Sequence, residues 1–236
     1  MGRVATNPSS ENPRWAVAER VTKALLLRHP DNIHAIGVHG ALAHGDDMDG
    51  SPVAITVITH RVDLGPQPSG RRISGVIVEL DSYSIDMGKA MASILSQSWP
   101  LQADRFLTAT PMYDPSGWHD EVRDLHLAFL ANAKAEEFAA LARQAWCRAS
   151  VARNRAIRLA VWHDTDGAMQ ALGEARLAAA LTHGLLTRTY FRDSGDAVRR
   201  TGLGDVGLGE LDERLDAQAL ALEKRGHPVD GDADDF

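Results

Sequence analysis

The pattern of hydrophobic and polar positions changes near the middle of the chain. In the first half, apolar residues at helical spacing between 15 and 29 predict a helix that ends at Pro30, and a second helix is expected at 84–95. Runs of β-branched and apolar residues predict three strands, at 33–38, 53–59 and 73–80. The run at 53–59 is the most β-branched, which favours a central position in a sheet.

Glycines, prolines and acidic residues separate these elements. The acidic segment 46–50 is expected to form a loop, and a short helix is expected to begin at 42–44. The segment 61–72, which contains two glycines and two prolines, predicts a hairpin or a surface loop. Prolines at positions 100, 111 and 115 predict an extended stretch that leads to the second half of the chain.

The second half has the pattern of a helical protein. The segment 119–161 lacks glycine and proline and is rich in Ala, Leu, Arg and Glu. Helices are predicted within 119–161, 168–190 and 211–224. The expected fold class is therefore α/β followed by all-α, with a mixed-sheet domain at 1–118 and a helical-bundle domain at 119–236. The leader 1–13 and the acidic end 230–235 are expected to lack regular structure.

Composition and charge exclude several classes of function. The formal net charge of −7 and the isoelectric point near 5.8 argue against non-specific nucleic-acid binding. No apolar run is long enough to cross a membrane, and the N-terminus has no hydrophobic signal segment. The single cysteine, Cys147, excludes an internal disulfide framework and favours a cytoplasmic location.

Common motifs for metals and cofactors are missing. The chain has no Cys-x-x-Cys or His-Glu-x-x-His pair and no Gly-Lys-Ser/Thr phosphate loop. The glycines of 202–207 match Gly-x-Gly-x-x-Gly, but they follow a helical region instead of a strand, so we interpret them as a loop. No cofactor is expected.

Five colinear segments together point to a family. They are Ile-Gly-Val-His-Gly at 36–40, Ser-Trp-Pro-Leu at 98–101, Pro-Met-Tyr-Asp at 111–114, Arg-Asn at 153–154, and the run 224–230. In these segments the chain resembles the kanamycin nucleotidyltransferase family of aminoglycoside-modifying enzymes, over essentially its whole length. The resemblance implies a nucleotidyltransferase-fold first domain, a helical second domain, and a homodimer whose clefts are shared between subunits.

The resemblance also implies that the family's catalytic residues have been replaced. The serine and arginine that contact phosphate fall on Ala41 and His44, and the two metal-binding acids fall on Pro52 and Ala54. The general base and the phosphate-binding lysine of the second domain fall on Cys147 and Val151. Without these groups, metal-dependent nucleotidyl transfer loses its metal site, its phosphate clamp and its base, so no metal is expected.

A shifted pair of acids offers an alternative metal site. Asp47 and Asp49 have the required Asp-x-Asp spacing, but they precede the expected position in a glycine-flanked loop and do not lie on the strand. We interpret them as a solvated acidic turn.

Residues left in the cleft supply candidate chemistry. His44, Glu79 and Cys147 are the candidate catalytic groups for proton transfer or nucleophilic attack. Strand alternation places Glu79 on one face with Ile77 and Asp81. The remaining candidate ligand-binding residues are His39, Ala41, Pro52, Ala54, Ile77, Asp81 and Val151.

Each candidate has a structural alternative. Cys147 could be a small apolar filler beside Trp146, which we expect in the core, and His44 could be a turn residue bonded to backbone. His60, at the end of the predicted central strand, is expected to be structural or solvent-facing. Asp114 is expected to cap the turn that leads to Trp118.

Three functions remain open from the sequence. The first is a metal-independent enzyme acting on a small natural product, such as a cyclase, dehydratase or isomerase. The second is a non-catalytic protein that binds an antibiotic-like small molecule. The third is a residual aminoglycoside-type nucleotidyltransferase that uses displaced acids.

Overall fold

The computed structural model describes residues 12–232. Contacts divide the chain into two compact units, the first formed by Met1–Ile94 and Asp104–Asn132, and the second by Leu95–Ala103 and Ala133–Phe236. The leader predicted to lack structure lies mostly outside the described residues, as do the last residues of the acidic end.

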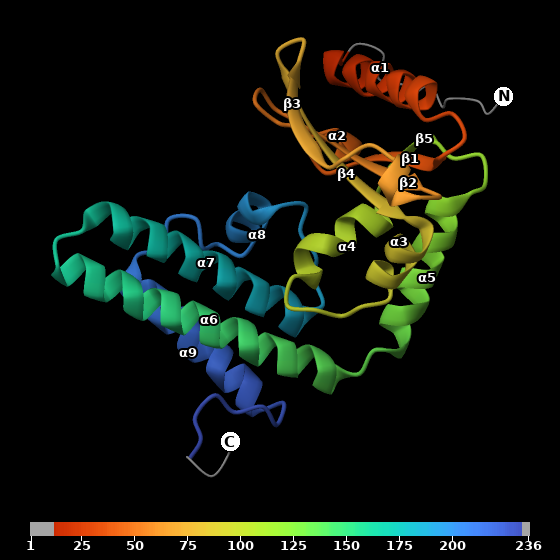
Figure 1. The fold of residues 1–236 in the computed structure, drawn as a ribbon. Coiled ribbons are helices and arrows are strands. Elements are labelled where there is room, and N and C mark those ends of the chain that lie inside the picture. The colour runs from red at the N-terminus through yellow and green to blue at the C-terminus, as the bar shows by residue number, and fades with distance from the viewer. Residues whose placement is uncertain (1–11, 233–236) are drawn as a thin grey trace. The chain divides into compact units, whose positions relative to one another are not determined.

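The first unit contains a five-stranded mixed sheet (Figure 1). Its strands are β1 Ile33–His39, β2 Val53–Thr59, β3 Ser69–Ile73, β4 Val76–Ser84 and β5 Thr110–Tyr113. The strand order is β3-β4-β2-β1-β5, so the β-branched run of β2 occupies the predicted central position. Strands β2 and β4 are parallel, whereas the other neighbours are antiparallel. The predicted mixed sheet is confirmed.

Helices cover both faces of this sheet. Helix α1 (Pro13–Arg28) packs on one face, where Trp15 and Leu25 meet the alternate strand residues Ile36, Val38 and Ile55. The opposite face is covered by α3 (Ile85–Ala92) and α5 (Trp118–Asn132). Alternation along each strand therefore divides its side chains between two separate cores.

The segment 61–72, predicted to form a hairpin or a surface loop, contributes a strand to a hairpin. The segment 61–72 contains a short 3-10 helix, η1 (Val62–Leu64), and most of β3. A hairpin joins β3 to β4 through Ser74 and Gly75, which both have positive φ, at 51° and 83°. Two consecutive positive φ values suit the right-handed twist of paired strands, which explains why the tight turn falls here.

The extended stretch predicted at 100–115 is wrong in its first half. Residues Trp99–Leu107 form helix α4, and β5 follows it. Pro100 is the second residue of that helix, in the first turn, where a backbone N–H would have no intrahelical partner. The proline therefore helps to begin a helix at a point where we had expected it to prevent one.

The second unit is all-helical, as predicted. It contains α6 (Ala135–Val161), α7 (Thr165–Thr187), α8 (Ser194–Arg200), which the pattern had not indicated, and α9 (Leu208–Glu223). Helices α6 and α7 form an antiparallel hairpin with α9 beside α6 (Figure 1). Buried alanines, among them Ala149 and Ala179, fill the core and allow close approach of the helix backbones.

The segment Leu95–Ala103, which includes the first half of α4, belongs to the second unit. The ring of Trp99 lies edge-on to Phe138 with centroids 5.2 Å apart, and the Phe191 N–H donates to the Pro100 carbonyl at 2.6 Å. Helix α5, which the predicted boundary at 118/119 assigns to the second domain, groups with the first unit. The domain boundary itself stays a prediction, which limited proteolysis would test.

Within residues 12–232, no helix combines the length and the apolar character that crossing a membrane requires.

Candidate functional site

The candidate site lies where β1 ends in the first unit. After His39 the chain turns at Gly40, whose φ of 73° and ψ of −155° are accessible mainly to glycine, and enters the short helix α2 (Ala41–His44). Gly45, with φ 72°, ends this helix. The Gly40 N–H donates to the Asp104 carboxylate at 3.3 Å, which ties the turn to α4.

A buried aspartate holds His44. Nε2 of His44 lies 2.7 Å from Oδ1 of Asp104, and the Thr108 hydroxyl donates to the same oxygen at 2.9 Å. The Asp104 side chain is 2% exposed, whereas that of His44 is 30% exposed. When Nε2–H donates a hydrogen bond to this carboxylate, Nδ1 is the ring nitrogen that can accept a proton. No described residue bonds to that nitrogen, so the geometry is that of an oriented general base.

Beside this pair, the strands place a row of side chains across the sheet. The register sets Ala54 opposite His39 on one side and opposite Glu79 on the other. These three residues line a cavity of about 370 Å³ together with Asp81 and Arg105. Four of the predicted site residues, His39, Ala54, Glu79 and Asp81, are therefore brought together.

Charge is distributed unevenly in this cavity. Arg105 donates to Asp81 at 3.4 Å and to the Tyr83 hydroxyl at 3.0 Å, which fixes the guanidinium. Glu79 is exposed and makes no ion pair with a described residue. The cavity therefore offers one immobilised cation and one free carboxylate.

His39 is neutral at physiological pH. Partial burial of the ring lowers the pKa of His39, and the nearby positive charge of Arg105 lowers it further, to about 4. The negative charges of Asp104 and Asp81 oppose this shift. The His44–Asp104 pair and the cavity adjoin one another, because Asp104 accepts a hydrogen bond from the N–H of Gly40, the residue after His39. A neutral His39 can donate or accept a hydrogen bond without adding charge.

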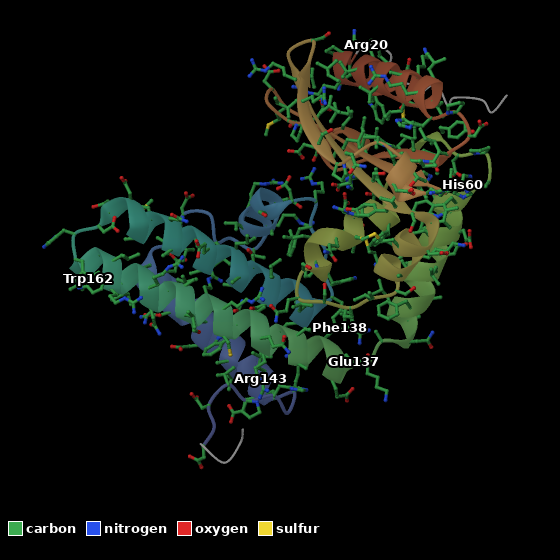
Figure 2. All side chains as sticks on the ribbon, viewed as in Figure 1. Arg20, His60, Glu137, Phe138, Arg143 and Trp162 are labelled. Carbon is green, nitrogen blue, oxygen red and sulfur yellow. The ribbon has the colours of Figure 1, made fainter. Side chains whose placement is uncertain are left out.

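Other predicted residues lie at the margin of this site. Ala41 is the first residue of α2, and Pro52 is exposed just before β2. Ile77 shares the face of Glu79, as predicted from alternation, but is 39% exposed and does not line the cavity. His60 lies just beyond the end of β2, with its ring 5.2 Å from that of His34 (Figure 2).

Cys147 and Val151 belong to the second unit. Both are exposed on α6 and line a cavity of about 520 Å³ between α6 and α7. The interpretation of Cys147 as a core filler is wrong, because its side chain is on the surface. Its neighbour Trp146 does pack inward and donates from Nε1 to the Leu215 carbonyl at 2.8 Å. Arg153 pairs with Asp212 of α9 in the same unit.

The loop acids are not equivalent. Asp47 is 5% exposed and accepts from Asn12 at 3.0 Å and from Arg14 at 3.1 Å, while Arg14 also reaches the Met48 carbonyl. The interpretation as a solvated turn is therefore wrong for Asp47, which anchors the loop to α1, and correct for the fully exposed Asp49.

Sequence reasoning missed Asp104 and Arg105. Both lie in the stretch predicted to be extended, where their side chains had no expected neighbours. On a helix, Asp104 and Thr108 are one turn apart, and a helical prediction for α4 would have indicated a polar face at this point.

Side chains that could hold a metal ion are few at this site. Pro52, just before β2, and Ala54 of β2 have no metal-ligating side chain, and Asp81 is bonded to Arg105. In the part of the chain that the structure describes, no three His, Cys, Asp or Glu side chains are grouped to hold a metal ion.

The chain is similar in structure to known proteins. No protein-family model matches the chain, and no curated protein matches it. Among solved structures, the chain is similar to a nucleotidyltransferase-like protein from Exiguobacterium sibiricum 255-15, with 12% identity and a TM-score of 0.43. The alignment covers 88% of this chain and 75% of that one.

Proposed function

We propose that the site at the end of β1 binds a small polar molecule and catalyses a metal-independent proton transfer on it. The observation that carries this proposal is the contact of 2.7 Å between His44 and the buried Asp104, with Nδ1 of the ring left available. An oriented imidazole of this kind typically contributes about 10²–10⁴-fold to a reaction rate.

The neighbouring groups have complementary roles in this proposal. His44 Nδ1 removes a proton from carbon or oxygen of the substrate, and the charge that develops on the substrate faces the Arg105 guanidinium. Glu79 or the imidazolium of His44 then donates a proton in the second transfer step. Return of the proton at another atom gives an isomerisation or a cyclisation, and its departure with a hydroxyl group as water gives a dehydration.

Deuterium exchange tests this proposal before the substrate is known. Compounds that raise the melting temperature would be selected from a library of aminoglycosides, polyols and hydroxy- or keto-acids. Each would then be incubated with the protein in D₂O and examined by mass spectrometry for deuterium uptake or loss of water. The wild-type protein should change at least one ligand, and His44→Gln and Asp104→Asn should not. Equal exchange by the wild type and His44→Gln would overturn the proposal.

Binding without catalysis is the second candidate. The polar cavity with its fixed Arg105 favours it, because such a site can hold a small molecule without any chemistry. Stabilising ligands that show no exchange or mass change in D₂O would support this candidate.

A residual nucleotidyltransferase is the third candidate. It is favoured by Glu79 and Asp81, which are two residues apart on the face of β4 that lines the cavity. Calorimetry with magnesium–ATP tests it: tight, metal-dependent binding that Glu79→Gln abolishes would establish nucleotide binding, and the absence of heat would remove this candidate.

The homodimer with a shared cleft and the cytoplasmic location stay proposals. In that dimer, Cys147 and Val151 would face the cleft across the subunit interface, as the family resemblance implies. Sedimentation would establish the oligomeric state. If Cys147 is catalytic, Cys147→Ser lowers deuterium exchange while leaving stability unchanged, because the side chain is exposed.

A further inference from the structure

A second cavity of the first unit lies on the other face of the sheet. It has a volume of about 560 Å³, within the range typical of small-molecule pockets. Its apolar floor consists of Val21, Leu25, Val78 and Leu80. Because β4 alternates, Val78 and Leu80 point away from the face that carries Glu79. The two cavities share Ser69 and Leu80 in their linings, and their other lining residues differ.

The cavity is bounded by α1 and by the β3–β4 hairpin. Arg20 of α1 joins the two by donating to Ser74 Oγ of the hairpin turn at 2.8 Å (Figure 2). The floor residues Leu25 and Val78 are buried, so the bottom of the cavity is already part of the hydrophobic core. A ligand that entered would contact a preformed apolar surface.

The rim of the cavity is positively charged. Arg28 lies at the end of α1, and Arg71 of β3 pairs in the sheet with Val78, which places it on the cavity side. Neither guanidinium makes a hydrogen bond or an ion pair with any residue from 12 to 232. No aspartate or glutamate lines the cavity, although the whole chain has a formal net charge of −7. The positive charge is therefore a local excess without an internal partner.

We propose that this cavity binds a small amphipathic carboxylate, with an acyl or aryl body on the apolar floor and its carboxylate held by Arg28 and Arg71. Guanidinium groups pair with carboxylates through two parallel hydrogen bonds. The inference does not rest on the proposed enzymatic function, because neither Arg28 nor Arg71 lines the candidate catalytic cavity.

Calorimetry with decanoate tests this site on the full-length protein. Decanoate should bind saturably with one-to-one stoichiometry, and decanol and decyltrimethylammonium should bind at least about tenfold more weakly. Arg28→Gln with Arg71→Gln should weaken decanoate by about tenfold or more for each arginine lost. Lys23→Gln removes a positive charge from α1 outside the cavity and should leave the affinity unchanged.

A steric variant gives an independent test. Ala24 lines the cavity and is exposed on α1, so Ala24→Trp should fill the space without disturbing the core, and should abolish decanoate binding. Near-ultraviolet circular dichroism would confirm that each variant is folded. The proposal is overturned if decanoate does not saturate, if decanol binds equally well, or if folded Ala24→Trp binds as the wild type does.

Discussion

The first unit contains two aspartate–histidine pairs whose surroundings differ. In one, His119 Nδ1 lies 3.0 Å from Asp114, and both side chains are 8% exposed. In the other, His44 Nε2 lies 2.7 Å from Asp104, and the ring is 30% exposed. The difference lies in the second ring nitrogen. That of His119 is closed off by the β1 backbone, since a Cβ added at Gly37 would lie 2.3 Å from its Nε2. That of His44 has no described partner.

The buried pair has a structural task. Asp114 accepts hydrogen bonds from the backbone N–H groups of Trp118 and His119, and so caps the start of α5, as the sequence predicted. Burial would raise the pKa of Asp114, but these N–H groups and the His119 ring hold it below its ordinary value. Burial also lowers the pKa of His119, although Asp114 opposes this. Solvent access to the second ring nitrogen, and not the pair itself, therefore distinguishes a candidate base from a structural element.

The largest expected effect separates the two pairs by activity. His44→Gln should reduce deuterium exchange on a bound ligand by about 10²–10⁴-fold, because it removes the base, while stability changes little at this partly exposed position. His119→Gln is the matched control and should lower stability while leaving exchange by the folded protein unchanged. Reduced exchange in folded His119→Gln, with normal exchange in His44→Gln, would reverse the assignment.

The next effect concerns stability at the buried pair. Asp114→Ala leaves two backbone N–H groups and an imidazole without their acceptor, and should lower the free energy of unfolding by about 2–3 kcal/mol. Denaturation by urea measures this loss. A loss close to zero would show that Asp114 does not cap α5. Gly37→Ala should lower the free energy of unfolding by an amount similar to that of Asp114→Ala, because the new methyl group forces the His119 ring away from the strand.

A smaller effect should appear in the pH dependence near the solvent-facing pair. The folded pKa of His39, about 4, is below the ordinary value of 6.5, so the unfolded chain binds the proton more readily. The stability that a neutral His39 contributes is present above pH 6.5 and is lost as the pH falls towards 4. The unfolding free energy of the wild type should decrease between pH 6.5 and pH 4, and in His39→Asn this decrease should be smaller by about 2 kcal/mol. An unchanged slope would show that the ring is not buried as described.

The smallest effect involves the loop acids. Asp47→Ala should lower stability by about 1–2 kcal/mol, because Asn12 and Arg14 lose a buried acceptor. Asp49→Asn should give no measurable change, since that side chain is fully exposed. If Asp47→Ala and Asp49→Asn changed stability equally, the anchoring role of Asp47 would be contradicted. Asp104 would then be the main buried carboxylate of this region.

The sequence predicted the sheet better than it predicted the site. The strands could be recognised because β-branched residues fill positions that are buried on both faces of β2, and the helices of the second unit because alanine and leucine recur at helical spacing. The prediction missed α4 because a proline is well tolerated in the first turn of a helix but disrupts a helix interior, and the sequence pattern did not show which position Pro100 occupies.

The site was predicted in part for a related reason. Alternation along β4 was sufficient to place Glu79 and Asp81 on one face. Asp104, however, is 60 residues from His44 along the chain, so only the folded path of α4 brings their side chains together. A local sequence pattern does not indicate a contact between residues so far apart in the chain. Cys147, which was proposed because it is the single thiol, lies in the other unit.

Helix α4 has a consequence for how such a protein can evolve. Its residues up to Ala103 belong to one compact unit, and those from Asp104 belong to the other, so neither unit is a contiguous piece of the gene. A recombination event that exchanged the region after residue 132 would separate Phe138 and Phe191 from Trp99 and Pro100. The two units are therefore expected to be inherited together. Changes in the core of the second unit affect the start of α4, and α4 supplies Asp104 to the first unit.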